Sequence, residues 1–276
     1  MTSVGFVGLG QIGRPMAKRL ATSDELDLWV YDVVADATEG FANVAGSVAE
    51  LGERCDVVCV MVRDDEQVRE VLGALLGTAK PGVVVAVHST IHPDTAANLA
   101  AVAAAREVGF VDAPVSGGSM GASDGTLAIM VGGAETSFER ARPVLEQLGS
   151  MVVHFGPAGA GTKAKLARNL LHFVSFTAVT EAQRLAESAG LDLEALGRIV
   201  RHTDAVTGGP GAIMLRSTAA PLAGDDPWRP ILEHVRNLGE KDLALALELA
   251  KANGVDVPLA RLALEQLGPG LGLEES

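Results

Sequence analysis

The chain has 276 residues, which is enough for one large domain or two ordinary domains with a sizeable core. Its formal net charge is −13 and its lysines and arginines are dispersed, so we expect no nucleic-acid partner. Hydrophobic residues make up 48% of the sequence, as in a globular protein, but no apolar run is long enough for a membrane span, so we expect no membrane partner.

A strand, a glycine turn and a helix are predicted at the start of the chain. The strand covers 4–7 and the helix covers 15–21, with no signal or transit peptide expected before them. The turn between them reads Gly8-Leu9-Gly10-Gln11-Ile12-Gly13. In a dinucleotide site, such glycines allow a tight turn, close approach of a pyrophosphate and close packing of the helix, whose N-terminus faces the phosphates. A purely structural glycine-rich turn is the alternative.

Asp32 follows the second predicted strand, 28–31, and lies about 20 residues after Gly13. A carboxylate at this place accepts a hydrogen bond from the adenosine ribose and repels a 2′-phosphate. Residues 33–35 supply no cation to hold that phosphate. We therefore expect NAD as the cofactor, with NADP disfavoured by Asp32. The alternative is that Asp32 only caps the next helix.

Cys55 and Cys59 are the two cysteines, and both are predicted to fall in one apolar strand. Their spacing places them on the same face of one extended segment, which cannot fold back to join them in a disulfide. No cysteine or histidine neighbours them at ligand spacing, so we expect no metal. Buried thiols are typical of a reducing compartment, and we expect a cytoplasmic protein.

Strands and helices alternate up to about residue 155. Further strands are predicted at 83–87, 109–111, 127–131 and 151–155, with helices at 66–76, 93–106 and 135–148. The strands are rich in Val and uniformly apolar, which is typical of a parallel sheet buried on both faces. The fold class expected is α/β: an N-terminal, Rossmann-like, doubly wound and mostly parallel sheet over 1–158.

The pattern changes after residue 156, and the remainder is predicted to be an all-α C-terminal domain over 159–276. Its helices are expected at 162–189, 193–202, 231–253 and 258–267, with a loop at 205–230 and a frayed tail at 271–276. The long first helix is apolar on most faces, which predicts burial between partners. We therefore expect a homodimer or a homotetramer.

Polar residues follow several predicted strands, at the sheet edge where ligands bind in such folds. Thr90, with Ser89, could hydrogen-bond the nicotinamide end, or one of the two could cap the next helix. Ser116-Gly117-Gly118 offers a hydroxyl and unshielded backbone N–H groups for a substrate carboxylate, or forms a plain turn.

Lys165 and Asn169 are four residues apart on the long predicted helix and share one of its faces. A lysine and an amide in a mostly apolar helix need a polar partner or a function. A surface lysine in an ion pair remains an alternative, and Lys163, two positions earlier, is the competing candidate.

With these segments the chain resembles the β-hydroxyacid dehydrogenases, the family of 3-hydroxyisobutyrate dehydrogenase and tartronate semialdehyde reductase. The resemblance covers nearly the whole chain and four motifs in order. These are the N-terminal stretch 4–17, the stretch 112–118, the pattern Gly159-x-Gly161-x-x-x-Lys165-x-x-x-Asn169, and Lys241-Asp242-Leu243.

The resemblance implies a role for each matched residue. Lys165 would be the general acid and base, with Asn169 holding the substrate beside it. Ser116, Gly117 and Gly118 would bind the substrate carboxylate. Contacts to the cofactor are implied for Met61, Val62, Thr90 and Lys241. The implied reaction is NAD-dependent hydride transfer between a small β-hydroxy acid and its semialdehyde or keto acid.

The chain departs from the family pattern at several positions, which are Ile12, Arg19, Arg63, His88 and Arg168. Arg168 is the departure nearest the chemistry and would suit a substrate with an extra anionic group, or simply face outward. An imine reductase, which usually has Asp or Tyr in place of the lysine, and a catalytically silent NAD-binding scaffold are the alternative functions. 6-Phosphogluconate dehydrogenase, a longer enzyme that prefers NADP, fits less well.

Overall fold

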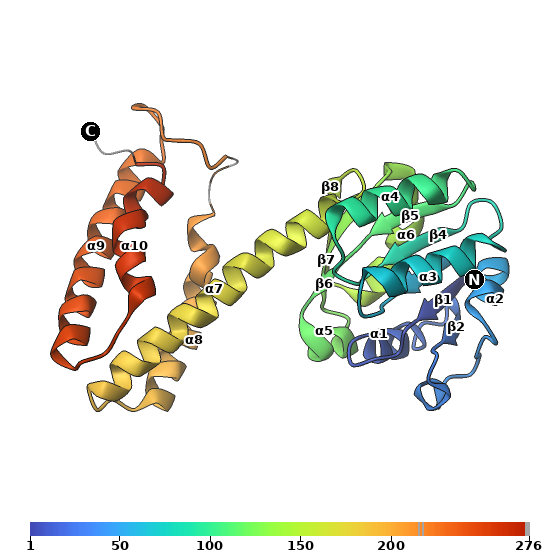
Figure 1. Cartoon of the computed structure of the whole chain (residues 1–276), viewed down its shortest axis with the longest axis horizontal. Coiled ribbons are helices and arrows are strands. Elements are labelled where there is room, and N and C mark those ends of the chain that lie inside the picture. Colours follow the sequence, from blue (N-terminus) through green and yellow to red (C-terminus); the bar gives the residue numbers. More distant parts are fainter. Residues whose placement is uncertain (215, 217, 274–276) are drawn as a thin grey trace. The chain divides into compact units, whose positions relative to one another are not determined.

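A computed structural model of the chain describes residues 1–214, 216 and 218–273. The chain divides into two compact units, 1–168 and 169–276 (Figure 1). The helix α7, Ala160–Ser188, runs through the division, so its first two turns belong to the first unit.

An eight-stranded sheet forms the centre of the first unit, in the order β2-β1-β3-β4-β5-β7-β6, with β8 also paired to β7. Pairs from β2 through β5 are parallel, β7 runs antiparallel to β5 and β6, and β8 is parallel to β7. The prediction of a mostly parallel, doubly wound sheet is therefore confirmed. The strands are β1 Thr2–Val7, β2 Leu26–Tyr31, β3 Val57–Val60, β4 Val84–Val87, β5 Gly109–Asp112, β6 Val115–Ser116, β7 Ala128–Gly133 and β8 Met151–Gly156.

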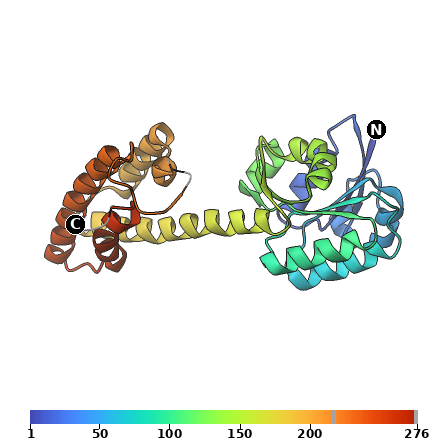
Figure 2. The same ribbon diagram turned by 90° about the horizontal axis from the view of Figure 1, so that it is seen from above.

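Helices cover both faces of this sheet, and Figure 2 shows α3 and α4 on one side and α6 on the other. Because alternate residues of a strand point to opposite faces, the central strands are apolar throughout and contribute to two separate cores. One core lies under α1 and α6, and the other lies under α2, α3 and α4. The helices are α1 Gly13–Leu20, α2 Val48–Arg54, α3 Asp65–Leu76, α4 Pro93–Ala104, α5 Gly118–Asp124 and α6 Glu135–Leu148, with a 3₁₀ turn, η1, at Ala35–Thr38.

Cys55 does not lie in a strand with Cys59, so the prediction that the two share one face is wrong. Cys55 is the C-cap of α2, and its side chain packs in the core under α2 and α3, whereas Cys59 lies in β3 and faces the opposite core. Both thiols are free and buried, as expected, and burial raises the pKa of each to about 12. Such thiols stay protonated and unreactive at neutral pH.

The last strand, β8, departs from the prediction of strands buried on both faces. Its residues alternate between exposed and half-buried, because β8 pairs only with β7, at the margin of the sheet. The two-residue β6 was not predicted at all.

The second unit contains helices and no strand among its described residues. After α7 come α8 Leu193–Thr207, the 3₁₀ turn η2 Gly209–Ile213, α9 Arg229–Ala252 and α10 Pro258–Gly270. Thus α8 and η2 occupy the first part of the predicted loop 205–230. The prediction of a frayed tail is wrong for Leu271 and Leu273, which are buried against Leu222 and Leu232. Residues 274–276 lie outside the described residues.

Candidate active site

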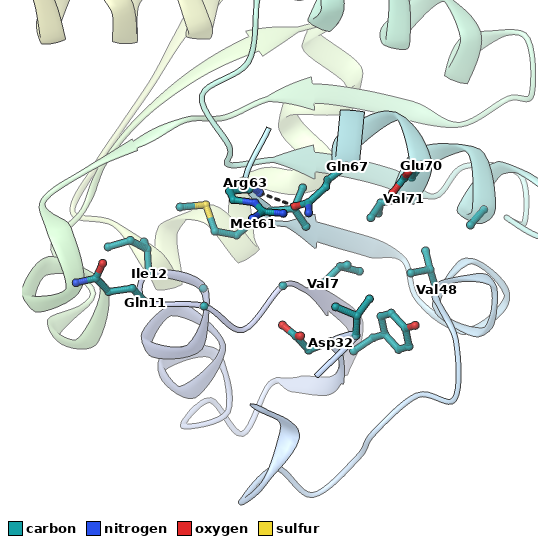
Figure 3. A pocket seen from close by; sticks show the side chains of 17 residues that line it. Val7, Gln11, Ile12, Asp32, Val48, Met61, Arg63, Gln67, Glu70 and Val71 are labelled. Atoms are coloured by element: carbon teal, nitrogen blue, oxygen red, sulfur yellow. Dashed lines mark hydrogen bonds between the residues drawn. The ribbon is translucent and has the colours of Figure 1, made fainter. Parts of the chain in front are cut away.

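A cavity of about 630 Å³ opens beyond the carboxyl ends of β1, β2 and β3. Figure 3 shows the glycine turn and Asp32 on one side of it, with Met61, Arg63 and Gln67 on the other. The position is the one where doubly wound sheets bind ligands. The lining residues predicted from the sequence are Gly8, Gly10, Gln11, Ile12, Gly13, Asp32, Met61 and Val62.

The three glycines of the turn differ in what surrounds them. Gly8 has φ +92°, and a Cβ there would collide with the carbonyl oxygen of Met61. A Cβ on Gly13 would collide with the carbonyl oxygen of Gly8, whereas a Cβ on Gly10 would meet nothing within 4 Å. Gly8 and Gly13 therefore serve the tight turn and its packing, and Gly10 leaves the backbone bare toward the cavity. The cradle suits a pyrophosphate.

The N-terminus of α1 borders the same cavity and has no side-chain cap. Its N-cap residue, Ile12, accepts no N–H group with its side chain, and its first turn holds no acidic residue. By contrast, α2 and α3 are capped by Ser47 and Asp64. In the first turn, the N–H of Arg14 donates to the carbonyl oxygen of Gly10, and Pro15 has no N–H. The positive dipole end of α1 is therefore the part of this terminus that favours an anion in the cavity.

Asp32 connects the end of β2 to the glycine turn. Its carboxylate accepts hydrogen bonds from the backbone N–H of Leu9 at 2.6 Å and of Val34 at 2.8 Å. It does not cap η1, which has no side-chain cap. Leu9 takes part through its backbone only, because its side chain is buried in the core and does not line the cavity. Each carboxylate oxygen keeps a lone pair for a ribose hydroxyl.

The opposite wall of the cavity is fixed by Ser89. The hydroxyl of Ser89 donates to the carbonyl oxygen of Val62 at 2.7 Å, and the N–H of Val62 lies 2.9 Å from the same hydroxyl. Arg63 follows, with its backbone N–H donated to the Gln67 side chain at 3.0 Å. Ser89 is thus a structural link between the loops after β3 and β4.

One face of α3 lines the cavity and was not singled out from the sequence. Its residues Gln67, Glu70, Val71 and Ala74 repeat at helical spacing, beside the buried face that carries Val68, Leu72 and Leu75. In the sequence, this face is marked by polar and apolar residues at helical spacing, beside the apolar face, on a helix that follows a strand.

Thr90 is exposed and does not line the cavity. Neither Thr90 nor Ser89 caps the next helix, because α4 is capped by the His92 side chain, which accepts from the N–H of Asp94. The contact of Thr90 with the nicotinamide end therefore stays a prediction.

Lys165 is buried near the start of α7 and is held by the segment that carries Ser116. Its Nζ donates to the carbonyl oxygen of Val115 at 2.7 Å and to the hydroxyl of Ser116 at 2.8 Å. Burial lowers the pKa of Lys165, and the Arg168 guanidinium lowers it further. Lys163, the competing candidate, is exposed, so the two lysines differ in burial.

The other implied site residues lie on three elements. Gly117 and Gly118 adopt positive φ values of 135° and 65° at the start of α5, conformations that favour glycine. Asn169 lies one turn beyond Lys165 on α7 and is half-buried. Lys241 lies exposed on α9, with its Nζ 3.3 Å from a carboxylate oxygen of Asp242.

His88, a departure from the family pattern, is a buried histidine at the end of β4. Its Nδ1 lies 2.9 Å from the carbonyl oxygen of Ala113, so this nitrogen carries the proton, and its ring stacks on Phe6. Burial lowers the pKa of His88 to about 4. The Nε2 atom is buried and has no hydrogen-bond partner among the described residues.

We expect His88 to make the protein acid-sensitive. Its folded-state pKa of about 4 lies below the ordinary 6.5. The unfolded chain therefore binds the proton first, and stability falls as the pH drops below 6.5. The loss by pH 4 is about 3 kcal/mol of unfolding free energy. Urea unfolding at pH 7 and pH 4 measures it. His88→Asn keeps a donor for Ala113 and should remove this part of the pH dependence, whereas His92→Asn, at an exposed histidine, should leave it unchanged.

Arg19, another departure, has a structural contact. Its Nε donates to the carbonyl oxygen of Gln147 at 3.2 Å and so connects α1 to the end of α6.

Among the described residues, no helix is long and apolar enough to cross a membrane. No group of three His, Cys, Asp or Glu side chains in that part of the chain is placed to hold a metal ion.

Both units of the chain match NAD-binding regions of known dehydrogenase families. Residues 3–156 match the NAD binding domain of 6-phosphogluconate dehydrogenase. Residues 159–269 match the NAD-binding region of NADP-dependent 3-hydroxyisobutyrate dehydrogenase.

Three similar proteins cover nearly the whole chain. An uncharacterised oxidoreductase of Mycobacterium tuberculosis is 50% identical, over 98% of this chain and 93% of its own. The NAD-dependent L-serine dehydrogenase of Pseudomonas aeruginosa is 35% identical, over 96% of this chain and 90% of its own. The crystal structure of an oxidoreductase from Mycobacterium avium superimposes with a TM-score of 0.95 at 49% identity, over 100% of both chains. Together with the glycine cradle, these matches show that the chain is an NAD(P)-binding oxidoreductase and belongs to the β-hydroxyacid dehydrogenase family.

Proposed function

We propose that the protein is an NAD-dependent dehydrogenase that interconverts a small β-hydroxy acid and its semialdehyde or keto acid, with Lys165 as the general acid and base. The observation that carries the proposal is the buried Lys165 ammonium group, held by Ser116 and by the carbonyl of Val115. A buried lysine with a lowered pKa is suited to proton transfer near neutral pH.

The names of the similar proteins favour a substrate class. L-Serine and 3-hydroxyisobutyrate both carry a hydroxymethyl group on the carbon next to the carboxylate, and they differ in one substituent on that carbon. A 2-substituted 3-hydroxypropanoate is therefore the class proposed here. Ser116 and the N–H groups of Gly117 and Gly118 would hold the carboxylate, and Asn169 would hold the hydroxyl group beside Lys165.

The residues of the chain would act as follows. A bound nicotinamide cofactor supplies the hydride chemistry. During oxidation, the neutral amine of Lys165 takes the hydroxyl proton of the substrate. During reduction, the ammonium form donates that proton to the carbonyl oxygen. The hydroxyl of Ser116 and the carbonyl of Val115 hold the Nζ atom of Lys165, so that the amine would be preorganised for proton transfer.

NAD is proposed as the cofactor because of the charge at the adenosine end of the cavity. The Asp32 carboxylate lines that end, and its fixed position would bring it against a 2′-phosphate. Residues 33–35 still supply no cation, although Arg63 on the opposite wall is a cation that lines the cavity.

A substrate panel tests the proposal. L-Serine, 3-hydroxyisobutyrate, other 2-substituted 3-hydroxypropanoates and the matching semialdehydes would be assayed with NAD(H) and NADP(H) in parallel, by absorbance of the reduced cofactor. Turnover with at least one member of the class and NAD is expected. Binding of NADH without turnover of any member would favour a silent scaffold instead, and turnover of cyclic imines alone would favour an imine reductase.

We also propose a homodimer or homotetramer that buries the apolar side chains of α7. These side chains are 45–69% exposed in the single chain: Leu166, Leu170, Phe173, Val174, Phe176 and Val179. Contiguous apolar surface of this kind marks an interface. Sedimentation should give two or four times the 28.4 kDa of one chain. Phe173→Glu should lower that mass, and Gln183→Glu, which adds the same charge at an exposed polar position of α7, should not.

A further inference from the structure

Asp112 is a fully buried carboxylate at the end of β5, and it takes no part in the proposed proton transfer itself. It accepts hydrogen bonds from the backbone N–H groups of Gly159 and Thr162, each at 2.7 Å. These two groups belong to the start of α7, so the carboxylate is the cap of the helix that carries Lys165.

The backbone around this cap is packed too closely to move independently of it. A Cβ on Gly161 would collide with the carbonyl oxygens of Met130 and Asp112. A Cβ on Gly132 would collide with the Asp112 carboxylate and with the N–H groups that begin α7. Close packing therefore fixes the position of the first turn of α7 against β5 and β7.

The chain segment that begins at Asp112 also holds Lys165 at its other end. Only two residues separate Asp112 from Val115, and the carbonyl of Val115 and the hydroxyl of Ser116 accept from the Lys165 ammonium group. His88 fixes the middle of the same segment through the carbonyl of Ala113. The segment 112–116 thus binds α7 at two places, at its N-terminus through Asp112 and one turn later through Lys165.

From this double attachment we infer that Asp112 is a positioning residue, whose carboxylate seats the start of α7 so that the Lys165 amine is held against Val115 and Ser116. The inference rests on the proposed role of Lys165 in proton transfer. Burial raises the pKa of Asp112, and the two backbone donors oppose that rise. Arg168, on α7, is the charged group that acts on Lys165 in addition to burial.

Asp112→Asn tests the inference, because an amide has the same shape but only one acceptor oxygen for two donors. The pKa of the Lys165 amine would be measured from its ¹³Cε signal by NMR, with the signal assigned by a Lys165→Arg variant, so no substrate is needed. In Asp112→Asn the helix start loosens and water reaches the amine. The pKa of Lys165 should then rise toward the ordinary value of about 10.4. With a substrate from the panel, kcat should fall by up to about 10²-fold while the Kd for NADH stays unchanged.

Glu181 provides a matched control, because it is a buried carboxylate that caps a different helix in the same way. It accepts from the N–H groups of Leu259 at 2.9 Å and Ala260 at 3.0 Å, at the start of α10. It lies on α7 roughly 24 Å beyond Lys165 along the helix axis. Glu181→Gln should lower the melting temperature as Asp112→Asn does, but it should not change the pKa of Lys165.

Two results would overturn the inference. One is an unchanged pKa of Lys165 in Asp112→Asn, and the other is an equal change in Glu181→Gln. If Asp112→Asn does not fold, the wild-type protein provides the test. The amide signals of Gly159 and Thr162 should titrate with Asp112, and the Lys165 ¹³Cε signal should move at the same pH or the inference fails. A Lys165→Ala variant that turns over normally would instead refute the proposed function, so the two failures are distinguishable.

Discussion

Lys165→Ala should lose about 10²- to 10⁴-fold in kcat while binding NADH with nearly unchanged affinity. The variant removes the buried amine that contacts Ser116, and it leaves the glycine turn and Asp32 in place. Steady-state turnover with a substrate from the panel gives kcat, and quenching of protein fluorescence by NADH gives Kd. The pH dependence adds a second measurement. Because burial lowers the pKa of Lys165, the oxidation rate should reach its plateau below the pH of about 10.4 expected for a free lysine.

Lys163→Ala is the matched control for this prediction. It deletes the competing candidate lysine, two residues away on the same helix, which is exposed and is not given a role in the proposed reaction. Its kcat and pH profile should match those of the wild type. If both variants lost activity equally, or if Lys165→Ala kept its activity, the general acid and base would have to be sought elsewhere.

Most of the fold could be predicted because its signals are local. The helix predicted at 135–148 has the observed bounds of α6, and the valine-rich strands were recognised as buried on both faces. β6 was missed because Val115–Ser116 is too short to show a period. Cys55 was misplaced because an apolar run does not reveal where α2 ends and β3 begins.

The candidate site was predictable to the extent that it consists of motifs. The glycine turn and Asp32 lie in the cavity as expected, because a strand, a turn and a helix in succession fix their own geometry. The cap on α7 could not be predicted in this way. Asp112 meets Gly159 and Thr162 across 47 and 50 residues of sequence, and only the packing of β5 beside β7 brings them together.

Tail residues show the same limit in the second unit. Leu271 and Leu273 lie in a glycine-rich C-terminal segment, which is typical of a frayed end. The neighbouring sequence does not indicate which side chains they pack against. Their partners are Leu222 and Leu232, which lie far back in the chain, so burial depends on how α9 and α10 pack.

Asp32→Ala should change cofactor binding in two ways. The preference for NADH over NADPH should fall, because the carboxylate that repels a 2′-phosphate and accepts from the ribose is gone. The affinity for NADH should also fall by about tenfold or more, because the N–H of Leu9 loses its charged acceptor and the glycine turn loses an anchor. Fluorescence titrations with NADH and NADPH on the same protein measure both effects.

Asp32→Asn separates these effects, because an amide oxygen can still accept from Leu9 while the negative charge is absent. The preference should relax in Asp32→Asn with a smaller loss of NADH affinity than in Asp32→Ala. Asp36→Asn, at an exposed acid of η1, is the control for a change of net charge and should alter neither quantity. Tighter binding of NADPH than of NADH by the wild-type protein would contradict the assignment of Asp32, and Arg63 on the opposite wall would then be the cation to examine.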